Sequence, residues 1–284
     1  MKRFPRRAAW ALLAAGLIYI GVCAALLLSQ NRLLYIGTVL PPHNPALSLP
    51  VFAAPDGTQL GWVAAPSGPA RGTVVFFHGN DEEAWQAARN YAPYFTARGW
   101  RVVFPEYRGF DFRKGQHPTH DTVIADAITA LRLAGQRYPG PLWIAGNSLG
   151  AGIAAQAAQA GGVGRVLLFV PWDSLGAVAA TRYPFVPVRW LLRLDGTEYD
   201  SCAALKNTDV PVYIVYAVRD VIIPARHARH LARCLGLPQG RIIALPGASH
   251  LDWYLRLSPA EWNILLDGAQ TSLLTPADRA KRLP

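Results

Sequence analysis

A serine between two glycines is the first candidate for chemistry in this chain. Residues 146–150 read Gly-Asn-Ser-Leu-Gly, which fits the pattern G-x-S-x-G. In a nucleophile elbow of this kind, the serine stands on a sharp turn between a strand and a helix, and its neighbours two residues away must be small. An apolar segment, 142–145, precedes the motif and a small-residue segment, 149–160, follows it. Ser148 is therefore predicted to be a nucleophile at the start of a helix.

A serine nucleophile needs a base and an acid. A serine hydroxyl reacts poorly near pH 7 unless a base, usually histidine, takes its proton and an acid orients that histidine. With a nucleophile elbow the chain order is serine, acid, histidine. His250 follows a late apolar segment and is predicted to be the base. Asp220, after the preceding apolar segment, is predicted to be the acid, and Asp173 is the alternative one segment earlier.

Backbone amides are predicted to stabilise the negative charge of the reaction. The sequence His-Gly-Asn at residues 78–80 follows the apolar segment 73–77. In such elbow enzymes one donor comes from this loop and the other from the residue after the nucleophile. The amides of Asn80 and Leu149 are therefore predicted to form an oxyanion hole. We expect His78 to orient the loop and not to act as a base.

Other histidines give weaker signals. His227 and His230 lie as neighbours on an arginine-rich helical segment, so we expect them on a solvated face and not in a metal pair. His117 and Asp121 fit a permissive H-x-x-x-D acyltransferase pattern, which we set aside because it spans a loop that opens a helix. The glycine-rich segment 146–152 matches neither a dinucleotide fingerprint nor a phosphate-binding loop with its lysine. No cofactor or metal is predicted.

The elements that must hold these residues alternate between strand and helix. Nearly continuous apolar strands separated by helices predict a doubly wound, mostly parallel sheet, hence an α/β fold. The predicted strands are 60–65, 73–77, 101–104, 142–145, 165–170, 212–216 and 241–245. The predicted helices are 82–97, 122–137, 149–160, 225–234 and 259–266.

Residues 171–211 interrupt this alternation. The interval has no clear strand and mixes aromatic and apolar residues with prolines and arginines. It is too short for an independent domain. We predict a short amphipathic cap over the carboxyl edge of the sheet.

The amino terminus predicts a membrane anchor. Four cations, Lys2, Arg3, Arg6 and Arg7, precede the apolar run 8–28. A helix of that length spans about 30 Å, the thickness of a bilayer core. A cleavable signal peptide is the alternative, but the run does not end in a good cleavage site. We expect residues 1–30 to be an uncleaved anchor with a cytoplasmic amino terminus, and residues 31–284 to be an exported, periplasmic or extracytoplasmic catalytic domain.

Charge and cysteine content narrow the remaining classes. The net charge is +10, but the basic residues are scattered outside the amino terminus and show no nucleic-acid-binding signature. We expect no nucleic-acid partner. Cys202 and Cys234 are far apart, with no metal-ligand spacing. We interpret them as isolated buried residues, with a disulfide as the alternative in an oxidising compartment.

Taken together, these motifs resemble the α/β-hydrolase superfamily and, more narrowly, its BEM46-like membrane-anchored serine hydrolases. The similarity covers roughly residues 31–270. It is carried by the segments 31–35 (Asn-Arg-Leu-Leu-Tyr), 78–80 (His-Gly-Asn), 105–110 (Pro-Glu-Tyr-Arg-Gly-Phe), 146–150 (Gly-Asn-Ser-Leu-Gly), 220–224 (Asp-Val-Ile-Ile-Pro) and 247–250 (Gly-Ala-Ser-His). The resemblance implies a Ser148–Asp220–His250 triad with an oxyanion hole at Asn80 and Leu149. One departure is the bulky segment 110–114, where the family usually has a small-residue turn.

These observations predict a serine hydrolase that cleaves a carboxylic ester through an acyl-enzyme. The apolar cap and the adjacent bilayer favour a lipid-like or acyl substrate. A serine peptidase is the alternative, for which Glu106 or Glu198 would be candidates to anchor a peptide terminus. A non-catalytic membrane scaffold with the same fold is a third hypothesis, against which the complete set of motifs argues.

Overall fold

The computed structural model describes residues 6–38, 49–194 and 198–267. The remaining parts of the predicted anchor, cap and catalytic domain lie outside the described residues. Within them the chain forms one eight-stranded sheet in the order β1-β2-β4-β3-β5-β6-β7-β8. The strands are β1 Val51–Ala53, β2 Gln59–Ala64, β3 Gly72–Phe77, β4 Trp100–Pro105, β5 Leu142–Asn147, β6 Val166–Phe169, β7 Val212–Ala217 and β8 Ile242–Leu245.

Most of the sheet is parallel. Strands β3 to β8 run parallel to their neighbours, whereas β1 pairs with β2 and β2 with β4 in antiparallel fashion. From β3 the chain moves to one side, to β4, and then crosses to β5 on the other side. Ligands of such sheets bind outside the carboxyl ends of the strands where this reversal occurs. The loop after β3 and the serine after β5 both lie at that point.

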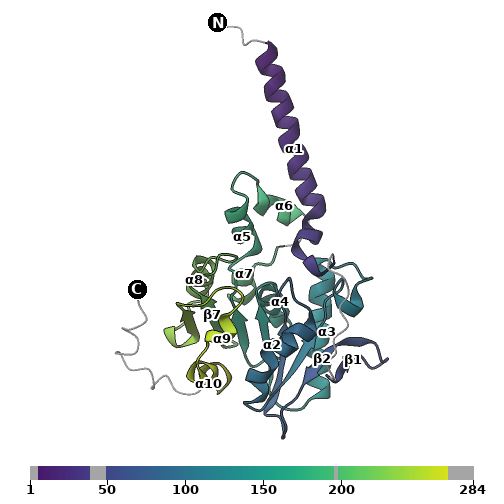
Figure 1. Cartoon of the computed structure of the whole chain (residues 1–284), viewed down its shortest axis with the longest axis vertical. Helices are drawn as coiled ribbons and strands as arrows, with labels where there is room; N and C mark the ends of the chain where they lie inside the picture. Colours follow the sequence, from purple (N-terminus) through teal and green to yellow (C-terminus); the bar gives the residue numbers. More distant parts are fainter. Residues whose placement is uncertain (1–5, 39–48, 195–197, 268–284) are drawn as a thin grey trace.

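Helices cover both faces of the sheet. Helices α3, α4, α7 and α8 contribute to one buried apolar cluster, and α2, α9 and α10 contribute to the other (Figure 1). This arrangement explains why the central strands are apolar on both sides. The helices are α1 Arg6–Leu34, α2 Ala84–Thr96, α3 His120–Arg137, α4 Leu149–Ala157, α5 Leu175–Arg182, α6 Val188–Leu194, α7 Ser201–Leu205, α8 Arg226–Cys234, α9 Trp253–Arg256 and α10 Pro259–Asp267. Short 3₁₀ helices occupy Ile36–Thr38, Asp111–Arg113, Ala158–Ala160 and Gln239–Arg241.

The predicted doubly wound, mostly parallel sheet is confirmed, and the seven predicted strands lie within two residues of the observed ones. Outside the interval 171–211, one strand and one helix are missing from the prediction, β1 and α9, because segments of three and four residues show too little periodicity. Helix α2 begins at Ala84, two residues later than predicted, since Oε1 of Gln86 accepts a hydrogen bond (2.8 Å) from the amide of Glu83 and caps the helix there.

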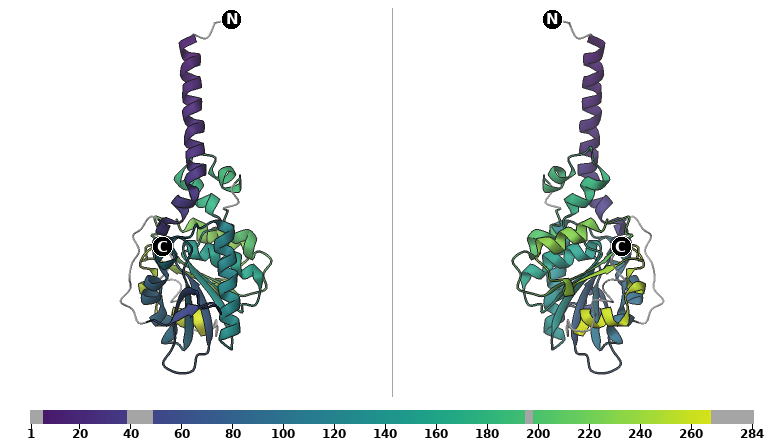
Figure 2. Two further views of the ribbon diagram at one scale, coloured as in Figure 1. Left: turned by 90° about the vertical axis from the view of Figure 1, so that its right-hand side faces the viewer. Right: turned by 90° about the vertical axis from the view of Figure 1, so that its left-hand side faces the viewer.

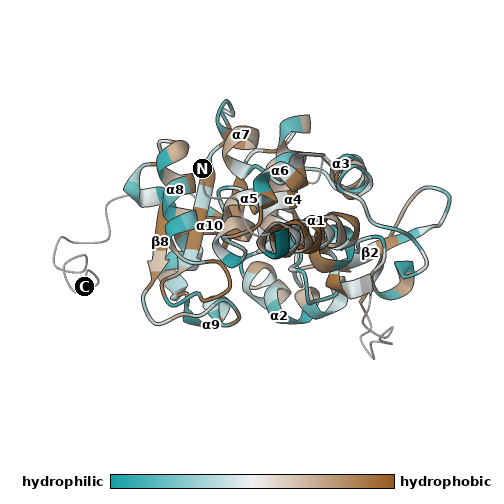
Figure 3. Cartoon of the chain, turned by 90° about the horizontal axis from the view of Figure 1, so that it is seen from above, coloured by the Kyte–Doolittle hydropathy of each residue, from teal (hydrophilic) through white to brown (hydrophobic). Residues whose placement is uncertain are grey.

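The interval 171–211 forms α5, α6 and α7 and no strand, apart from an isolated bridge between Ser174 and Asp200. Helix α7 packs against α4 on the sheet. Helices α5 and α6 lie beside α1, as the three views agree (Figures 1, 2 and 3). The interval predicted to be a cap therefore contains a helical hairpin, α5 and α6, placed next to the amino-terminal helix.

Helix α1 projects from the domain as a long rod (Figures 1 and 2). Among the described residues it is the one helix whose length and apolar composition would let it cross a membrane, and a signal sequence would have the same properties. Its ribbon, seen nearly end-on, is largely brown in the hydropathy colouring, with a teal near end (Figure 3). The helix continues past residue 30 to Leu34, and Tyr35, immediately after it, is fully buried in the domain.

Candidate active site

The turn between β5 and α4 holds Ser148 in a conformation that few residues adopt. Its backbone angles are φ 56° and ψ −115°, a costly region for a residue with a Cβ. A Cβ at Gly146 would lie 2.0 Å from the carbonyl oxygen of Gly150, and a Cβ at Gly150 would lie 2.0 Å from that of Phe77. Only glycine fits at either position. The local spacing G-x-S-x-G thus follows directly from the tightness of the turn.

Three predicted residues from separate loops meet at this turn. The hydroxyl of Ser148 donates to Nε2 of His250 (2.9 Å), and Nδ1 of His250 donates to Oδ2 of Asp220 (2.6 Å). All three residues are less than one tenth exposed. A carboxylate on Nδ1 fixes the tautomer in which Nε2 can accept a proton from a serine. This geometry is suited to general-base activation of Ser148.

Asp220 is itself held in place by the turn that follows β7. Its Oδ1 accepts hydrogen bonds from the amides of Ile222 (2.9 Å) and Ile223 (2.7 Å), while Oδ2 remains directed at His250. These two amide donors fix the orientation of the carboxylate. Asp173, the alternative acid, lies after the neighbouring strand β6 and contacts other histidines.

The predicted oxyanion donors flank Ser148. Leu149 is the first residue of α4, so its amide has no carbonyl partner within the helix. Asn80 lies in the loop after β3 and lines the same pocket as Ser148. The side chain of Asn80 is directed elsewhere, because its Oδ1 accepts a hydrogen bond (3.0 Å) from the amide of Ile36. The amino-terminal segment is therefore joined to this loop.

A partly buried carboxylate links the two loops of the site. Oε1 of Glu82 accepts hydrogen bonds from the amide of Gly79 (2.9 Å), from Nδ2 of Asn147 (3.1 Å) and from the hydroxyl of Tyr91 (3.2 Å). Burial raises the pKa of Glu82. On the other side of Asn147, Oδ1 accepts from Nε1 of Trp253 (3.0 Å). Sequence reasoning misses this network because its members are distant along the chain and share no pattern.

His78 supports the loop after β3 from inside the protein. Its side chain is inaccessible, and Nε2 contacts Oε1 of Glu106 (2.9 Å) while Nδ1 contacts the carbonyl oxygen of Gly79 (2.8 Å). Burial alone would lower the pKa of His78, but the Glu106 carboxylate outweighs it and raises the pKa. Glu106 also accepts from the amide of Ala84 (3.0 Å). Glu106 is thus occupied inside the protein and is not placed to anchor a peptide terminus.

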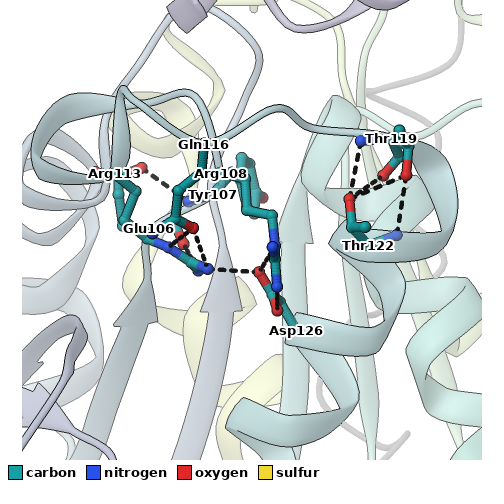
Figure 4. Close-up of polar contacts among 8 residues, drawn as sticks. All are labelled: Glu106, Tyr107, Arg108, Arg113, Gln116, Thr119, Thr122 and Asp126. Atoms are coloured by element: carbon teal, nitrogen blue, oxygen red, sulfur yellow. Dashed lines mark hydrogen bonds and ion pairs between the residues drawn. The ribbon is translucent and has the colours of Figure 1, made fainter.

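The bulky segment after β4 packs into the structure. Phe110 is fully buried, and Arg113 donates to the carbonyl of Glu106 (2.9 Å) and to Asp126 of α3 (2.7 Å). Arg108 binds both carboxylate oxygens of Asp126 (2.8 and 2.9 Å; Figure 4). Two arginines on one carboxylate attach the loop to α3. The departure from a small-residue turn therefore gives a fixed loop beside Glu106.

The expectation that His227 and His230 lie on a solvated face is wrong for His227, whereas His230 is exposed as expected. His227 is 5% exposed, and its Nδ1 donates to Oδ1 of Asp173 (2.8 Å). His230 is the more exposed of the two, yet its Nδ1 donates to Oδ2 of Asp173 (2.7 Å). Burial would raise the pKa of Asp173, but hydrogen bonds from His227, the amide of Ser174 and His230 hold it below the ordinary value. Asp173 thus binds α8 to the loop after β6.

The two cysteines are also paired. Cys202 of α7 and Cys234 of α8 form a disulfide with a Cα–Cα distance of 6.1 Å, a usual separation for such a bond. The interpretation as isolated residues is therefore wrong, because a sequence separation of 32 residues says nothing about the packing of α7 on α8. Within the described part of the chain, no three metal-ligating side chains group together.

A pocket of about 440 Å³ opens beside Ser148. Its polar lining residues include Asp81, Gln86 and Arg89 of the β3–α2 region. Its apolar lining residues include Ile36, Ile222, Leu251 and Tyr254. The described residues of the interval 171–211, including Glu198, do not line it. Access to Ser148 is therefore bounded by α2, by the loops carrying Asp220 and His250, and by the segment that follows α1.

Comparisons with known proteins agree with this architecture. Residues 68–168 match the family described as serine aminopeptidase, S33. Two uncharacterized proteins of Mycobacterium tuberculosis, Rv2307c of strain H37Rv and MT2364 of strain CDC 1551, are each 31% identical over 84% of this chain and 86% of their own length.

Solved structures share the fold at low identity. An α/β serine hydrolase homologue from Coxiella burnetii superposes with a TM-score of 0.58 at 18% identity, over 80% of this chain and 100% of its own. The thermophilic esterase Est2 from Thermogutta terrifontis gives a TM-score of 0.55 at 18% identity, over 82% and 94%. With this fold and a relative matched over most of its length, the chain belongs to the α/β-hydrolase superfamily, in the same family as Rv2307c.

Proposed function

We propose that the chain is a serine hydrolase that cleaves carboxylic esters of lipid-like or acyl substrates, with Ser148 as nucleophile, His250 as base and Asp220 as acid. The observation that carries the proposal is the hydrogen-bonded series from Ser148 through His250 to Asp220, at 2.9 and 2.6 Å, beside an open pocket. Solved structures that share the fold include a serine hydrolase homologue and an esterase, and the fold alone leaves the substrate open.

The reaction has two halves. Ser148 Oγ attacks the ester carbonyl while Nε2 of His250 takes the hydroxyl proton, and the same proton is then delivered to the departing alcohol. In the second half, His250 takes a proton from water, the hydroxide attacks the acyl-enzyme, and the proton returns to Ser148. Asp220 orients the imidazole and stabilises its charged form without being protonated.

The amides of Asn80 and Leu149 stabilise the oxyanion in both halves. The amide of Leu149 lies at the positive end of α4, which favours negative charge there. Glu82 supports this hole, because it binds Gly79 on one loop and Asn147 next to the nucleophile. Correct spacing of the two loops is what an oxyanion hole requires.

The apolar lining residues of the pocket favour an ester with an apolar part. Ile222 and Leu251 line the pocket and remain exposed to 43% and 64%. The esterase from Thermogutta terrifontis shares the fold. The peptidase alternative takes its support from the family described as serine aminopeptidase, and the pocket carboxylate of Asp81 would have to bind an amino terminus.

Replacement of the nucleophile tests the proposal. We expect Ser148→Ala and His250→Ala each to lower hydrolysis of an aryl ester by at least about 10⁴-fold, and Ser148→Ala to abolish labelling by a fluorophosphonate. His227→Ala is the matched control, since it removes a histidine of a similar Asp–His pair that does not face Ser148. It should retain activity and labelling.

Retained ester hydrolysis and labelling in Ser148→Ala would refute this proposal. A wild-type chain that is folded but neither labels nor hydrolyses any substrate would favour a scaffold. Esters of graded chain length, thioesters and aminoacyl arylamides, assayed on the wild type, separate the classes. Preference for arylamides over all esters would replace the esterase assignment with the peptidase.

We also propose that α1 is an uncleaved anchor, with its amino terminus cytoplasmic, and that the chain belongs to the BEM46-like membrane-anchored hydrolases. The cations that precede the apolar run favour this orientation. Gln30 and Tyr35 are buried in the domain, so the end of α1 is part of the folded unit. The disulfide between Cys202 and Cys234 is typical of an oxidising, extracytoplasmic compartment.

A further inference from the structure

Residues 183–190, which comprise the connection between α5 and α6 and the first turn of α6, expose large apolar side chains next to α1. We call this segment the α5–α6 hairpin. Phe185 is 88% exposed, Trp190 60% and Tyr183 43%. Soluble proteins rarely gather such side chains on one surface unless something binds there. None of the three lines the pocket beside Ser148.

The hairpin contacts α1 well above the domain. The hydroxyl of Tyr19 donates to the carbonyl oxygen of Phe185 (3.0 Å), and α6 packs against α1. Front and side views agree that the hairpin lies alongside the domain-proximal half of α1 (Figures 1 and 2).

The position of Tyr19 along α1 indicates how deep in a bilayer the hairpin would lie. Tyr19 lies nine residues before Leu28, where the apolar run ends. At 1.5 Å per residue that places Tyr19 about 14 Å inside a bilayer core about 30 Å thick. Whatever is bonded to Tyr19 then lies in the hydrocarbon of the leaflet nearer the catalytic domain.

The backbone of the hairpin is suited to that environment. In hydrocarbon, each peptide N–H and C=O needs a partner within the protein. Positions 184 and 187 are prolines, which have no N–H to satisfy. The amide of Val186 donates to the carbonyl of Tyr183 (3.1 Å), and the carbonyl of Phe185 accepts from Tyr19. Tyr19 thus supplies a partner that water would supply elsewhere.

Charges border the apolar tip on both sides. Arg182 ends α5 and Arg189 lies in the first turn of α6, and both are exposed. Arginine side chains can extend from an apolar site to lipid phosphates, and tyrosine and tryptophan prefer the interface. An apolar tip (Phe185), flanked first by aromatic residues and then by arginines, is typical of an element that inserts into a membrane.

We propose that the α5–α6 hairpin inserts into the phospholipid bilayer alongside α1, in the leaflet nearer the catalytic domain. The proposal rests on α1 spanning that bilayer, and it is independent of the reaction at Ser148. The catalytic domain then has two points of membrane contact, and the pocket, whose wall includes Ile36 just after α1, is held close to the lipid surface.

Spin labels on the full-length chain test the depth. In a Cys23→Ala background with the disulfide intact, single cysteines are introduced by Phe185→Cys, Ile18→Cys and Ser67→Cys, and each chain is labelled and reconstituted in phosphatidylcholine nanodiscs. Ile18 lies on the exposed surface of α1. Ser67 lies in the exposed loop before β3, at the opposite edge of the sheet. The ratio of collision rates with oxygen and with a water-soluble nickel chelate reports depth.

We expect the oxygen-to-nickel collision ratio at position 185 to be higher than the aqueous value measured at position 67 and close to the membrane-buried value measured at position 18. An aqueous value at 185, with 18 buried, would overturn the insertion while leaving the anchor intact. An aqueous value at position 18 would show that α1 does not span the bilayer and would also overturn the proposal. Shielding of 185 from both reagents, with dipolar broadening between chains, would assign the hairpin to a second copy and also overturn it. Ser148→Ala in the same background separates these outcomes from failure of the hydrolase proposal, because the depths should not change.

Discussion

Two Asp–His pairs lie at the carboxyl edge of the same sheet, after neighbouring strands. Asp220 follows β7 and holds Nδ1 of His250 at 2.6 Å, and Asp173 follows β6 and holds Nδ1 of His227 at 2.8 Å. In both pairs the carboxylate also accepts a backbone amide of the following turn. Both histidines are less than one tenth exposed. By carboxylate–imidazole geometry alone the pairs are nearly equivalent.

The pairs differ at the far side of the imidazole. Nε2 of His250 accepts from the Ser148 hydroxyl, whereas Nε2 of His227 is buried with no hydrogen-bond partner among the described residues. In addition, Asp173 binds a second histidine, His230. An Asp–His pair therefore becomes a candidate for catalysis only through the group that its Nε2 faces. Without such a group it serves to join one loop to one helix.

Asn in place of Asp220 should give the largest effect. We expect Asp220→Asn to lower kcat/KM for an aryl ester by about 10⁴-fold, because an amide can stabilise the wrong imidazole tautomer. Asp173→Asn should stay within about twofold of wild type, well under the 1.4 kcal/mol that a tenfold change represents. Steady-state kinetics on both purified variants makes the measurement. Equal losses in the two variants would break the distinction between the pairs.

The disulfide should contribute the next largest effect, confined to stability. Cys234 lies on α8, the helix that carries His227 and His230, and is bonded to Cys202 on α7. We expect replacement of both cysteines by serine to lower the free energy of unfolding by about 2–4 kcal/mol, as measured by urea denaturation. Cys23→Ser, which changes the unpaired cysteine of α1, is the control and should leave it unchanged. If the double variant were as stable as wild type, α8 would not depend on this bond.

The Asp173–His227 pair should contribute less to the free energy of unfolding than the disulfide does. Its contribution should be larger near neutral pH than in acid. We expect Asp173→Asn to lower the free energy of unfolding by about 1–3 kcal/mol near pH 7. Because the folded-state pKa of Asp173 is depressed, its contribution is present above the ordinary aspartate value of about 3.9 and is lost as pH falls through the folded pKa.

Denaturation of both chains at several pH values tests this. The difference between wild type and Asp173→Asn should shrink in acid. His230→Ala removes the more exposed partner and should cost less than about 1 kcal/mol. A larger loss for His230→Ala than for Asp173→Asn would contradict the central role of Asp173.

The extent to which sequence predicts this molecule depends on how local each constraint is. The parallel sheet follows from runs of apolar residues, and the turn at Ser148 follows from two glycines two residues away, both of which are short-range patterns. His227 shows the opposite case. Its place on an arginine-rich helix predicts that it is exposed. It is buried instead because it bonds Asp173, which lies 54 residues earlier in the chain. Tertiary packing alone decides that burial.

The same limit applies to the support of the site and to the cap. Glu82 joins the loop at Gly79 to Asn147, 65 residues away, and no periodicity marks such a contact. The interval 171–211 has the aromatic and apolar content of a cap, but its position beside α1 depends on a contact between Tyr19 and Phe185, 166 residues apart. Composition predicts that such a segment covers something, and only the fold specifies what.

If α1 is the membrane anchor proposed above, its joint with the domain has a kinetic consequence. Tyr35 bonds Tyr199 hydroxyl to hydroxyl at 2.8 Å, and the amide of Ile36 bonds the loop that carries Asn80. With no slack tether at this joint, an enzyme held by α1 could not swing out to sample bulk solution. Its encounters with a lipid-borne ester would occur by lateral diffusion in two dimensions. Its turnover would then follow the mole fraction of the ester among the lipids, and dilution of the whole suspension would leave the rate per enzyme unchanged.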